Sequence, residues 1–453
     1  ITAEDTIATV NRNTQAFANG DVQLLQSQAQ RVEAQAQIDS LLRQPLTQND
    51  AVKVMLLGSP SFQALLAQGI ASSAGAAQTG RIANPSLSVE RMSSLADTEL
   101  TRVLTFGLLD VLMLPTKQRY ATQMVHEVEL RLAADVVQGI AQTRQAWVKA
   151  VAAKQRLSYA QQVMRSANAS AELAARLQRV GNITVVARSQ QHLYAADAAV
   201  ALANAQHAHT SAQEALTRAL GLRAQQLDRL QLPERLPDLP NQYTTPEEVS
   251  AQAMAARLDV RMAAQSAEAA GVAQQMQAIT SLTDVEWGIR RVRTTDKATG
   301  DVATSSGNEI SIKLPLFDWG DATRTRMNAQ ALAALNQYEA TLINASSQLR
   351  EAYSAYRTTF DIAQHYQREV IPLRMRISEE NQYRYNGMLI STFDLLADAR
   401  AQVSVVQAAL GANEQFWLAD VVLNAHVVGS PMMQTAMGAS AGADAAMAGG
   451  AAH

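Results

Sequence analysis

The chain has 453 residues, of which 47% are hydrophobic, 17% charged and 5% aromatic, and its net charge is −3. This near-neutral balance argues against a nucleic-acid-binding protein, and the absence of cysteine excludes disulfides, thiolate metal sites and cysteine nucleophiles. No apolar run approaches the ~20 residues of a transmembrane helix, which excludes a helical membrane protein, whereas a membrane β-barrel needs only about ten weakly alternating residues per strand. The chain begins at Ile1 without a signal-like segment, which we interpret as a processed form.

The first part of the chain is predicted to be helical. Apolar residues near helical spacing predict a helix over 21–42. A second helix starts at an N-cap formed by Asn49-Asp50 and runs to about Gly80, with a break at Ser59-Pro60 because proline disfavours the helical conformation of the residue before it.

Two strands are predicted next. Polar and apolar residues alternate over 86–92, and 100–114 is rich in Val, Leu, Thr and Phe and stops at Pro115. The polar stretch 93–99 between them is predicted to be a turn.

A very long helix follows over 117–180, where apolar and small residues recur at spacings of three and four. Roughly 64 residues would span about 96 Å at the standard helical rise. Gly181-Asn182 predicts a tight turn, and 183–220 returns as an alanine-rich helix that Gly221 caps.

A proline-rich linker at 231–246 separates two similar halves. The second half opens with a helix over 247–280, followed by strands at 284–293 and 309–314. The polar stretch 294–308 between these strands is predicted to be a loop.

A second long helical run covers 322–385, Asn386-Gly387 forms its turn, and 389–425 is the return helix. Pro372 lies inside this run. It either divides the run into two helices or is tolerated as a kink, and the sequence leaves both alternatives open.

The two halves share one order of elements, which indicates internal duplication. Gly181 matches Gly387, and Pro115 matches Pro315. The predicted divisions are an N-terminal helical segment at 1–48, a first repeat at 49–230, a linker at 231–246, a second repeat at 247–428 and a disordered Ala/Gly/Met tail at 429–453.

Four strands beside helices of about 100 Å cannot form a compact globule, and an open four-stranded sheet exposes two edges. Closure by several chains removes the edges, and three chains would give twelve strands. The fold class predicted is therefore mainly α with a small β part. The long helical hairpins would pack as an α-barrel, and four strands per chain would contribute to a twelve-stranded trimeric β-barrel.

Several segments in order resemble the TolC-type outer-membrane efflux family over residues 49–425. They are Arg-Val-Gly-Asn-Ile at 179–183, Arg-Leu-Asp-Val-Arg-Met-Ala at 257–263, Leu-Pro-Leu-Phe-Asp-Trp-Gly-Asp at 314–321, Arg-Tyr-Asn-Gly at 384–387 and Phe-Asp-Leu-Leu-Ala-Asp-Ala-Arg at 393–400. The branch associated with copper and other heavy-metal tolerance is the most similar.

This resemblance implies a homotrimer in the outer membrane, with most of its mass in the periplasm. It would act as the exit duct of a tripartite efflux system, joined through a periplasmic adaptor to an inner-membrane pump. It would contact outer-membrane lipid, bind no nucleic acid and no cofactor, catalyse no reaction, and conduct heavy-metal ions or drugs passively. Members often carry an N-terminal acylated cysteine, which this sequence lacks.

The two glycine turns are expected to lie at the periplasmic tips. The resemblance implies that they dock the adaptor, while the simpler interpretation is that Gly and Asn supply the positive φ that a helical hairpin needs. The candidate docking residues are Val180, Gly181, Asn182, Ile183, Tyr385, Asn386, Gly387, Met388 and Leu389.

Charged residues near the second tip are candidates for an aperture gate: Arg384, Asp394, Asp398 and Arg400. Asp394 and Asp398 are four residues apart and are expected on one helix face, where carboxylate rings of a trimer would favour cations. The family commonly has a carboxylate where Ala397 stands here. The alternative is that these are solvated charges, with Asp398 paired to Arg400 or a neighbour.

No metal site or enzyme motif is predicted. His207 and His209 would point to different helix faces, and a soft-metal site in the tail, at Met432, Met433, Met437, Met447 and His453, is a weak alternative.

The second functional hypothesis is a soluble long-helix coiled-coil scaffold or adaptor with a small β-domain. In the channel hypothesis, Leu87, Val89, Leu104, Phe106, Leu108, Ile310 and Ile312 would face lipid and Trp287, Phe317 and Trp319 would form girdles, while Arg290, Arg291 and Arg293 fit a lipid face less well.

Overall fold

The computed structural model describes residues 2–18, 20–227, 229–243, 257–280, 285–314, 317 and 319–429. They fall into two compact units. Unit 1 takes its residues from Ile1–Thr6, Gln68–Arg131 and Asp259–Ile343, and unit 2 from Ile7–Ala67, Leu132–Leu258 and Asn344–His453. Each unit therefore combines residues from both halves of the sequence. The expected start of a helix at 247, Pro315 and the tail from 430 onward lie outside the described residues.

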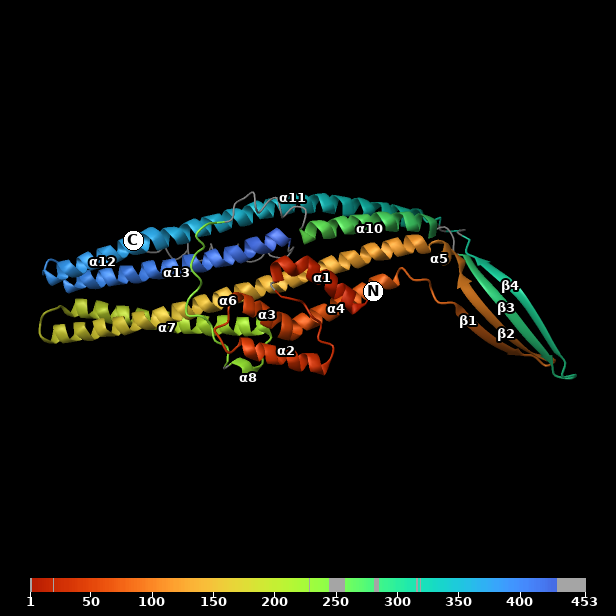
Figure 1. The fold of residues 1–453 in the computed structure, drawn as a ribbon, viewed down its shortest axis with the longest axis horizontal. Coiled ribbons are helices and arrows are strands. Elements are labelled where there is room, and N and C mark those ends of the chain that lie inside the picture. Colours follow the sequence, from red (N-terminus) through yellow and green to blue (C-terminus); the bar gives the residue numbers. More distant parts are fainter. Residues whose placement is uncertain are drawn as a thin grey trace. The chain divides into compact units, whose positions relative to one another are not determined.

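Most described residues belong to helices, many of them long (Figure 1). The helices are α1 (Ala3–Ala18), α2 (Gln28–Leu41), α3 (Gln48–Gly58), α4 (Pro60–Gln78), α5 (Leu108–Leu112), α6 (Leu114–Arg179), α7 (Val185–Leu220), α8 (Ala224–Leu227), α10 (Leu258–Thr280), α11 (Asp321–His365), α12 (Ile371–Asn386) and α13 (Thr392–Val428), with a π-helical segment η1 (Tyr366–Val370).

Unit 1 contains the four-stranded antiparallel sheet, with strand order β1-β2-β3-β4. The strands are β1 (Ser86–Ser93), β2 (Asp97–Gly107), β3 (Val285–Asp296) and β4 (Val302–Ile312). β2 pairs with β3, which joins the two halves of the sequence in one sheet. β1 and β4 are the edges, and each is paired on one side only among the described strands.

Two strand predictions were wrong in extent. The stretch 294–308, expected to be a loop, is mostly strand, because pairing of β3 with β4 extends through it and only Lys297 to Asp301 turn. Asp296 tightens that turn by accepting hydrogen bonds from the backbone of Ala298 and Thr299. The strand expected to reach residue 114 ends at Gly107, and the apolar residues after it form α5.

The N-terminal helices also begin elsewhere than expected. The helix predicted over 21–42 starts only at Gln28, after a capping box in which Ser27 and Gln30 bond to each other's backbone. α1 lies in the segment 1–48 that was predicted to be helical, although no separate helix was predicted before residue 21. The break at Ser59-Pro60 is confirmed, but the cap of α3 is Thr47. No single described helix is long and apolar enough to cross a membrane, and only α3 and α4 together, bent by 59°, pass that test.

The helical run through Pro372 is continuous, so the alternative of a tolerated proline holds. Proline lacks an N–H and its ring clashes with the carbonyl of the preceding turn. The π-helical segment η1 widens the helix just before α12. A wider turn relieves that clash without ending the helix.

Aromatic side chains join α11 to α13 in unit 2. The ring of Phe416 lies 5.6 Å from that of Phe360 and 5.5 Å from that of Tyr356, measured between centroids. All three side chains are buried, together with Leu349 and Leu423. Burial of these rings aligns the two helices side by side.

Several charged side chains of unit 2 are buried or half-buried. Arg257 is fully buried and its Nη1 donates to the carbonyls of His426, at 2.7 Å, and Ala345, at 3.4 Å. Arg144 of α6 donates to the carbonyl of Phe17 at 2.8 Å. Burial raises the pKa of Asp420 to about 6, although the positive charge of Arg144 opposes the shift.

Asp420→Asn is expected to remove a pH dependence of stability. Because the pKa of Asp420 rises from 3.8 to about 6 on folding, the folded state holds more protons between these values. The free energy of unfolding should therefore fall as the pH rises from about 4 to about 6. Above pH 6 the asparagine variant avoids a buried charge, and its Tm should exceed that of the wild type by about 2–4 °C.

Thermal unfolding at pH 4.5 and pH 7.5 measures this difference. The same substitution at the exposed Asp197 is the control, and its Tm should follow the wild type at both pH values. A greater advantage of Asp420→Asn at pH 4.5 than at pH 7.5 would contradict the expected sign.

Candidate functional site

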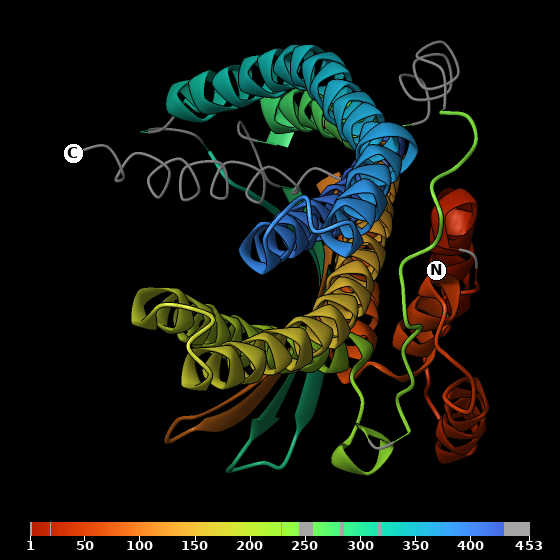
Figure 2. The same cartoon turned by 90° about the vertical axis from the view of Figure 1, so that its left-hand side faces the viewer.

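The first hairpin tip, between α6 and α7, closes through a left-handed glycine. Gly181 has φ +80°, and its N–H donates to the carbonyl of Gln178 at 3.0 Å. The N–H of Asn182 reaches back to the carbonyl of Leu177 at 2.9 Å, which completes a Schellman motif. Val180 is exposed and Ile183 is half-buried. Both tips face the viewer in Figure 2.

The second tip, between α12 and α13, has the same hydrogen bonds but no left-handed glycine. Gly387 has φ −81°, and the positive φ of +58° belongs to Met388. Met388 donates to Tyr385 at 2.9 Å, and Leu389 donates to Arg384 at 2.8 Å. Met388 is therefore the structural counterpart of Gly181. The sequence match of Gly181 with Gly387 was wrong by one residue.

A left-handed conformation costs a residue with a Cβ about 1 kcal/mol or more. The side chain held there is nevertheless in solvent, since Met388 is 93% exposed. Leu389 and Val180 are also largely exposed, and Tyr385 is partly so. The tips thus present apolar side chains that contribute little to packing within the chain.

Asp394 acts as a helix cap. Its Oδ2 accepts from the backbone N–H of Ser391 at 3.0 Å and from the Ser391 hydroxyl at 2.8 Å, while its own N–H donates to that hydroxyl. The hydrogen bond from the Ser391 side chain, followed by the one from its backbone, lowers the pKa of Asp394. Thr184 caps α7 in the same way, with Ala187 in place of the aspartate.

Asp398 is buried and faces α12. Its Oδ1 accepts from Nη2 of Arg374 at 2.7 Å and from Nδ2 of Asn381 at 2.9 Å. Asp394, by contrast, is exposed. The two carboxylates were expected on one helix face, but one is buried against α12 and the other is in solvent. Asp398 does pair with a neighbour, but that neighbour is Arg374 and not Arg400.

Arg400 joins α13 to α7. Its Nη2 donates to Oε1 of Gln191 at 2.9 Å, and its guanidinium carbon lies 4.4 Å from the ring centroid of Tyr194. Arg384 is exposed, and its side chain makes no hydrogen bond or ion pair with the described residues. α13 is consequently tied to α12 by Asp398 and to α7 by Arg400.

Sequence reasoning missed the partners of these charges: Arg374, Asn381, Gln191 and Tyr194. They come from other helices, and pairing across helices leaves no fixed spacing in the sequence. The one available signal was that Arg374 and Asn381 are seven residues apart, which places both on one helix face.

The strand register in unit 1 sorts the sheet into two unlike faces. The first, face A, consists of 87, 89, 91 and 93 of β1 with their partners in the other strands. It carries most of the large apolar residues, although Met92, Val103 and Val292 lie on the other face. The row Leu87–Leu104–Ile289 and the adjacent pair Phe106–Trp287, whose rings stack at 6.1 Å, belong to it. The second, face B, is mainly Ser, Thr and carboxylates.

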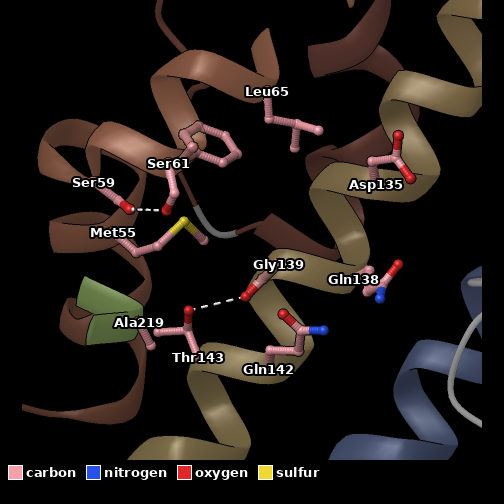
Figure 3. A pocket seen from close by; sticks show the side chains of 11 residues that line it. Met55, Ser59, Ser61, Leu65, Asp135, Gln138, Gly139, Gln142, Thr143 and Ala219 are labelled. Atoms are coloured by element: carbon pink, nitrogen blue, oxygen red, sulfur yellow. Dashed lines mark hydrogen bonds between the residues drawn. The ribbon is translucent and has the colours of Figure 1, made fainter. Parts of the chain in front are cut away.

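A further cavity of about 370 Å³ lies in unit 2 between α3, α4 and α6 (Figure 3). The hydroxyls of Ser59 and Ser61 meet at 2.9 Å, and Thr143 donates to the carbonyl of Gly139. Asp135 is the single titratable side chain among the residues that line this cavity.

Within the described ranges, no three His, Asp or Glu side chains are placed to hold a metal ion. On α7, His207 is exposed and His209 is half-buried, and burial lowers the pKa of His209. The Met and His residues of the tail lie outside the described residues.

No family model and no curated protein matches the sequence. Solved structures do match. A membrane protein from Pseudomonas aeruginosa has a TM-score of 0.70 at 17% identity, with 84% of this chain and 93% of that chain covered. The outer membrane protein VceC of Vibrio cholerae has a TM-score of 0.68 at 17% identity, covering 87% and 97%. The chain has the fold of the TolC-type outer-membrane channels.

CusC, a protein that forms a transmembrane channel, has a TM-score of 0.69 at 15% identity, covering 87% of this chain and 92% of its own. The TolC-type fold confirms the predicted combination of long helical hairpins with four strands per chain.

Substitutions of the left-handed residues at the two tips are expected to change stability in opposite directions. Met388→Gly should raise the stability of unit 2 by about 1 kcal/mol, because glycine adopts positive φ without steric cost. Gly181→Ala should lower the stability of unit 2 by a similar amount. The positive φ is the whole cause of this cost, because an added Cβ would meet no atom within 4 Å. Thermal or denaturant unfolding measures both. Gly387→Ala, at negative φ, is the control and should change stability far less.

Proposed function

We propose that three copies of this chain form an outer-membrane channel that serves as the exit duct of a tripartite efflux system. The observation that carries the proposal is the division of the sheet into an apolar face A and a polar face B. A sheet that separates lipid from a water-filled lumen needs this alternation. The long-helix scaffold hypothesis requires no exposed apolar sheet face.

The edges of the sheet support assembly. β1 and β4 have 8 and 11 residues and leave their outer backbone groups without a strand partner among the described residues. Long unpaired edges favour pairing with another chain, and lipid tolerates no unsatisfied backbone. Pairing β4 of one copy with β1 of the next closes twelve strands in three copies. Exposed Trp287, Phe317 and Trp319 would supply interfacial aromatic residues.

We propose the tips as the surface that docks a periplasmic adaptor. Val180, Met388 and Leu389 expose apolar side chains there, and Met388 keeps its exposed position at the cost of an unfavourable backbone conformation. Such strain is characteristic of binding sites. The remaining tip residues, Gly181, Asn182, Ile183, Tyr385, Asn386 and Gly387, would shape the two turns.

We propose the charged groups of α13 as an aperture latch. Asp398 holds α13 to α12 through Arg374, and Arg400 holds α13 to α7 through Gln191. The first bond lies within the second hairpin and fixes α13 on α12, whereas the bond from Arg400 joins the two hairpins, so breaking it would let the hairpins separate. Arg384 and Asp394, which are exposed, are left to meet the adaptor or a neighbouring copy.

The pore prediction is that the protein purified in mild detergent contains three chains of 48.8 kDa and forms channels in planar bilayers. Arg400→Ala should increase conductance severalfold, because it removes the hydrogen bond to Gln191 that joins the two hairpins. The control is Asp361→Ala, which breaks an exposed ion pair with Arg357 on α11 and should not change conductance. A monomer that needs no detergent and conducts no ions would refute the channel.

The docking prediction concerns Met388. Met388→Asp should abolish the transport-dependent resistance of cells, because a carboxylate cannot enter an apolar pocket of the adaptor without desolvation cost. The trimer and its bilayer conductance should stay intact. Met388→Leu should keep resistance. The control is Leu335→Asp, at an exposed position on α11. Retained resistance in Met388→Asp would remove the docking role.

A further inference from the structure

The charges of the sheet are segregated between its two faces. All six strand carboxylates lie on face B: Glu90, Asp97, Glu99, Glu286, Asp296 and Glu309. Four of the five strand arginines lie on face A, together with the apolar residues: Arg91, Arg102, Arg291 and Arg293. Only Arg290 lies on face B, 4.0 Å from Glu309. The apolar face is therefore positively charged and, over its described residues, free of carboxylates.

The four arginines of face A form one cluster. Arg102 and Arg291 are direct partners across β2 and β3, and Arg293 follows Arg291 on the same face. Leu100 of β2 lies between Arg91 of β1 and Arg293 of β3 and pairs with both. It is two residues from Arg102, so Arg91 lies beside the other three arginines. All four side chains are exposed. Like charges directly opposite each other destabilise a sheet, so the cluster gains stability from an anion that bridges it.

The cluster borders the apolar rows on the side of the hairpin turns. Arg102 and Arg291 lie two residues beyond Leu104 and Ile289, which is about 7 Å along the strands. Beyond them the chain turns at 94–96 and 297–301. The other ends of the strands lead into the helices of unit 1. Face A therefore changes from apolar to cationic in the direction of the turns.

We propose that this arginine cluster binds the phosphate groups of phosphorylated lipid headgroups in the leaflet at the turns. The inference rests on the proposed channel, in which face A meets lipid and the helices lie in the periplasm, so that the turns reach the outer leaflet. Guanidinium groups bind phosphate oxygens in a bidentate manner, and near a membrane surface this attraction is only partly screened. The apolar rows beside the cluster contact the acyl chains of the same lipid.

Charge complementarity selects the class of lipid. A zwitterionic headgroup has its own ammonium beside its phosphate and gains little from four arginines. A glycolipid with two phosphomonoesters carries several negative charges and matches a cluster spread over three strands. Free phosphate shares the anion but has no acyl chains to cover face A.

The experiment compares the neighbouring arginines 290 and 291, which lie on opposite faces of β3. Trimers in zwitterionic detergent–lipid micelles receive diphosphorylated lipid A, its monophosphorylated form or inorganic phosphate, and native mass spectrometry counts the lipids retained. Wild type should retain diphosphorylated lipid A and bind the monophosphorylated form about tenfold more weakly, as expected for a lost charge-assisted contact.

Arg291→Gln and Arg102→Gln should each weaken retention of diphosphorylated lipid A about tenfold or more. Arg291→Lys should weaken it less, and Arg290→Gln should leave it unchanged. Equal retention in Arg290→Gln and Arg291→Gln would overturn the proposal. Displacement of the lipid by millimolar inorganic phosphate would also overturn it, since the cluster would then be a site for free anions.

Bilayer conductance of the same preparations separates this inference from the proposed function. Trimers that conduct normally but retain lipid A equally with and without Arg102 and Arg291 would refute the lipid site and leave the channel in place. Wild-type protein that neither trimerises nor conducts would overturn both.

Discussion

The unpaired edges of the four-stranded sheet are the constraint on which the rest of the molecule depends. β1 and β4 leave rows of backbone donors and acceptors without a strand partner among the residues that the structure describes. Only pairing with further copies satisfies them in lipid. The alternation of apolar and polar residues, the segregation of charge and the long helices that leave the sheet are all consistent with this requirement. The same closure would place the acidic face B around a lumen that favours cations.

The helical hairpins solve a second problem, which is how to turn a very long helix back on itself. Both tips do so with the same Schellman hydrogen bonds and a capped return helix. Their difference is chemical. The first tip uses glycine and the second holds an exposed methionine in the left-handed conformation. A duplicated fold thus carries two unequal surfaces, and the strained one has the stronger claim to a binding role.

Much of the architecture could be predicted from the sequence because it is local. Uninterrupted apolar periodicity predicted α6, α7, α11 and α13, and Gly181 and the break at Ser59-Pro60 were located correctly. Errors arose where tertiary contacts outweigh local preference. The polar residues 302–308 form a strand because β3 pairs with them. The sequence left two alternatives open at Pro372, and the structure has the tolerated proline, which a π-helical turn precedes.

The sequence by itself determined the element order, the duplication and the resemblance to the TolC-type family. Periodicity and turn residues depend only on short stretches of the chain, so they can be recognised without tertiary contacts. Only the tertiary structure decided the partner of Asp398, the left-handed residue of the second tip and the face of each strand charge. Arg290 and Arg291 are neighbours in sequence, yet the pleat sends them to opposite faces. The face that would meet lipid in the proposed channel depends on the register across three strand pairs, and no single segment encodes it.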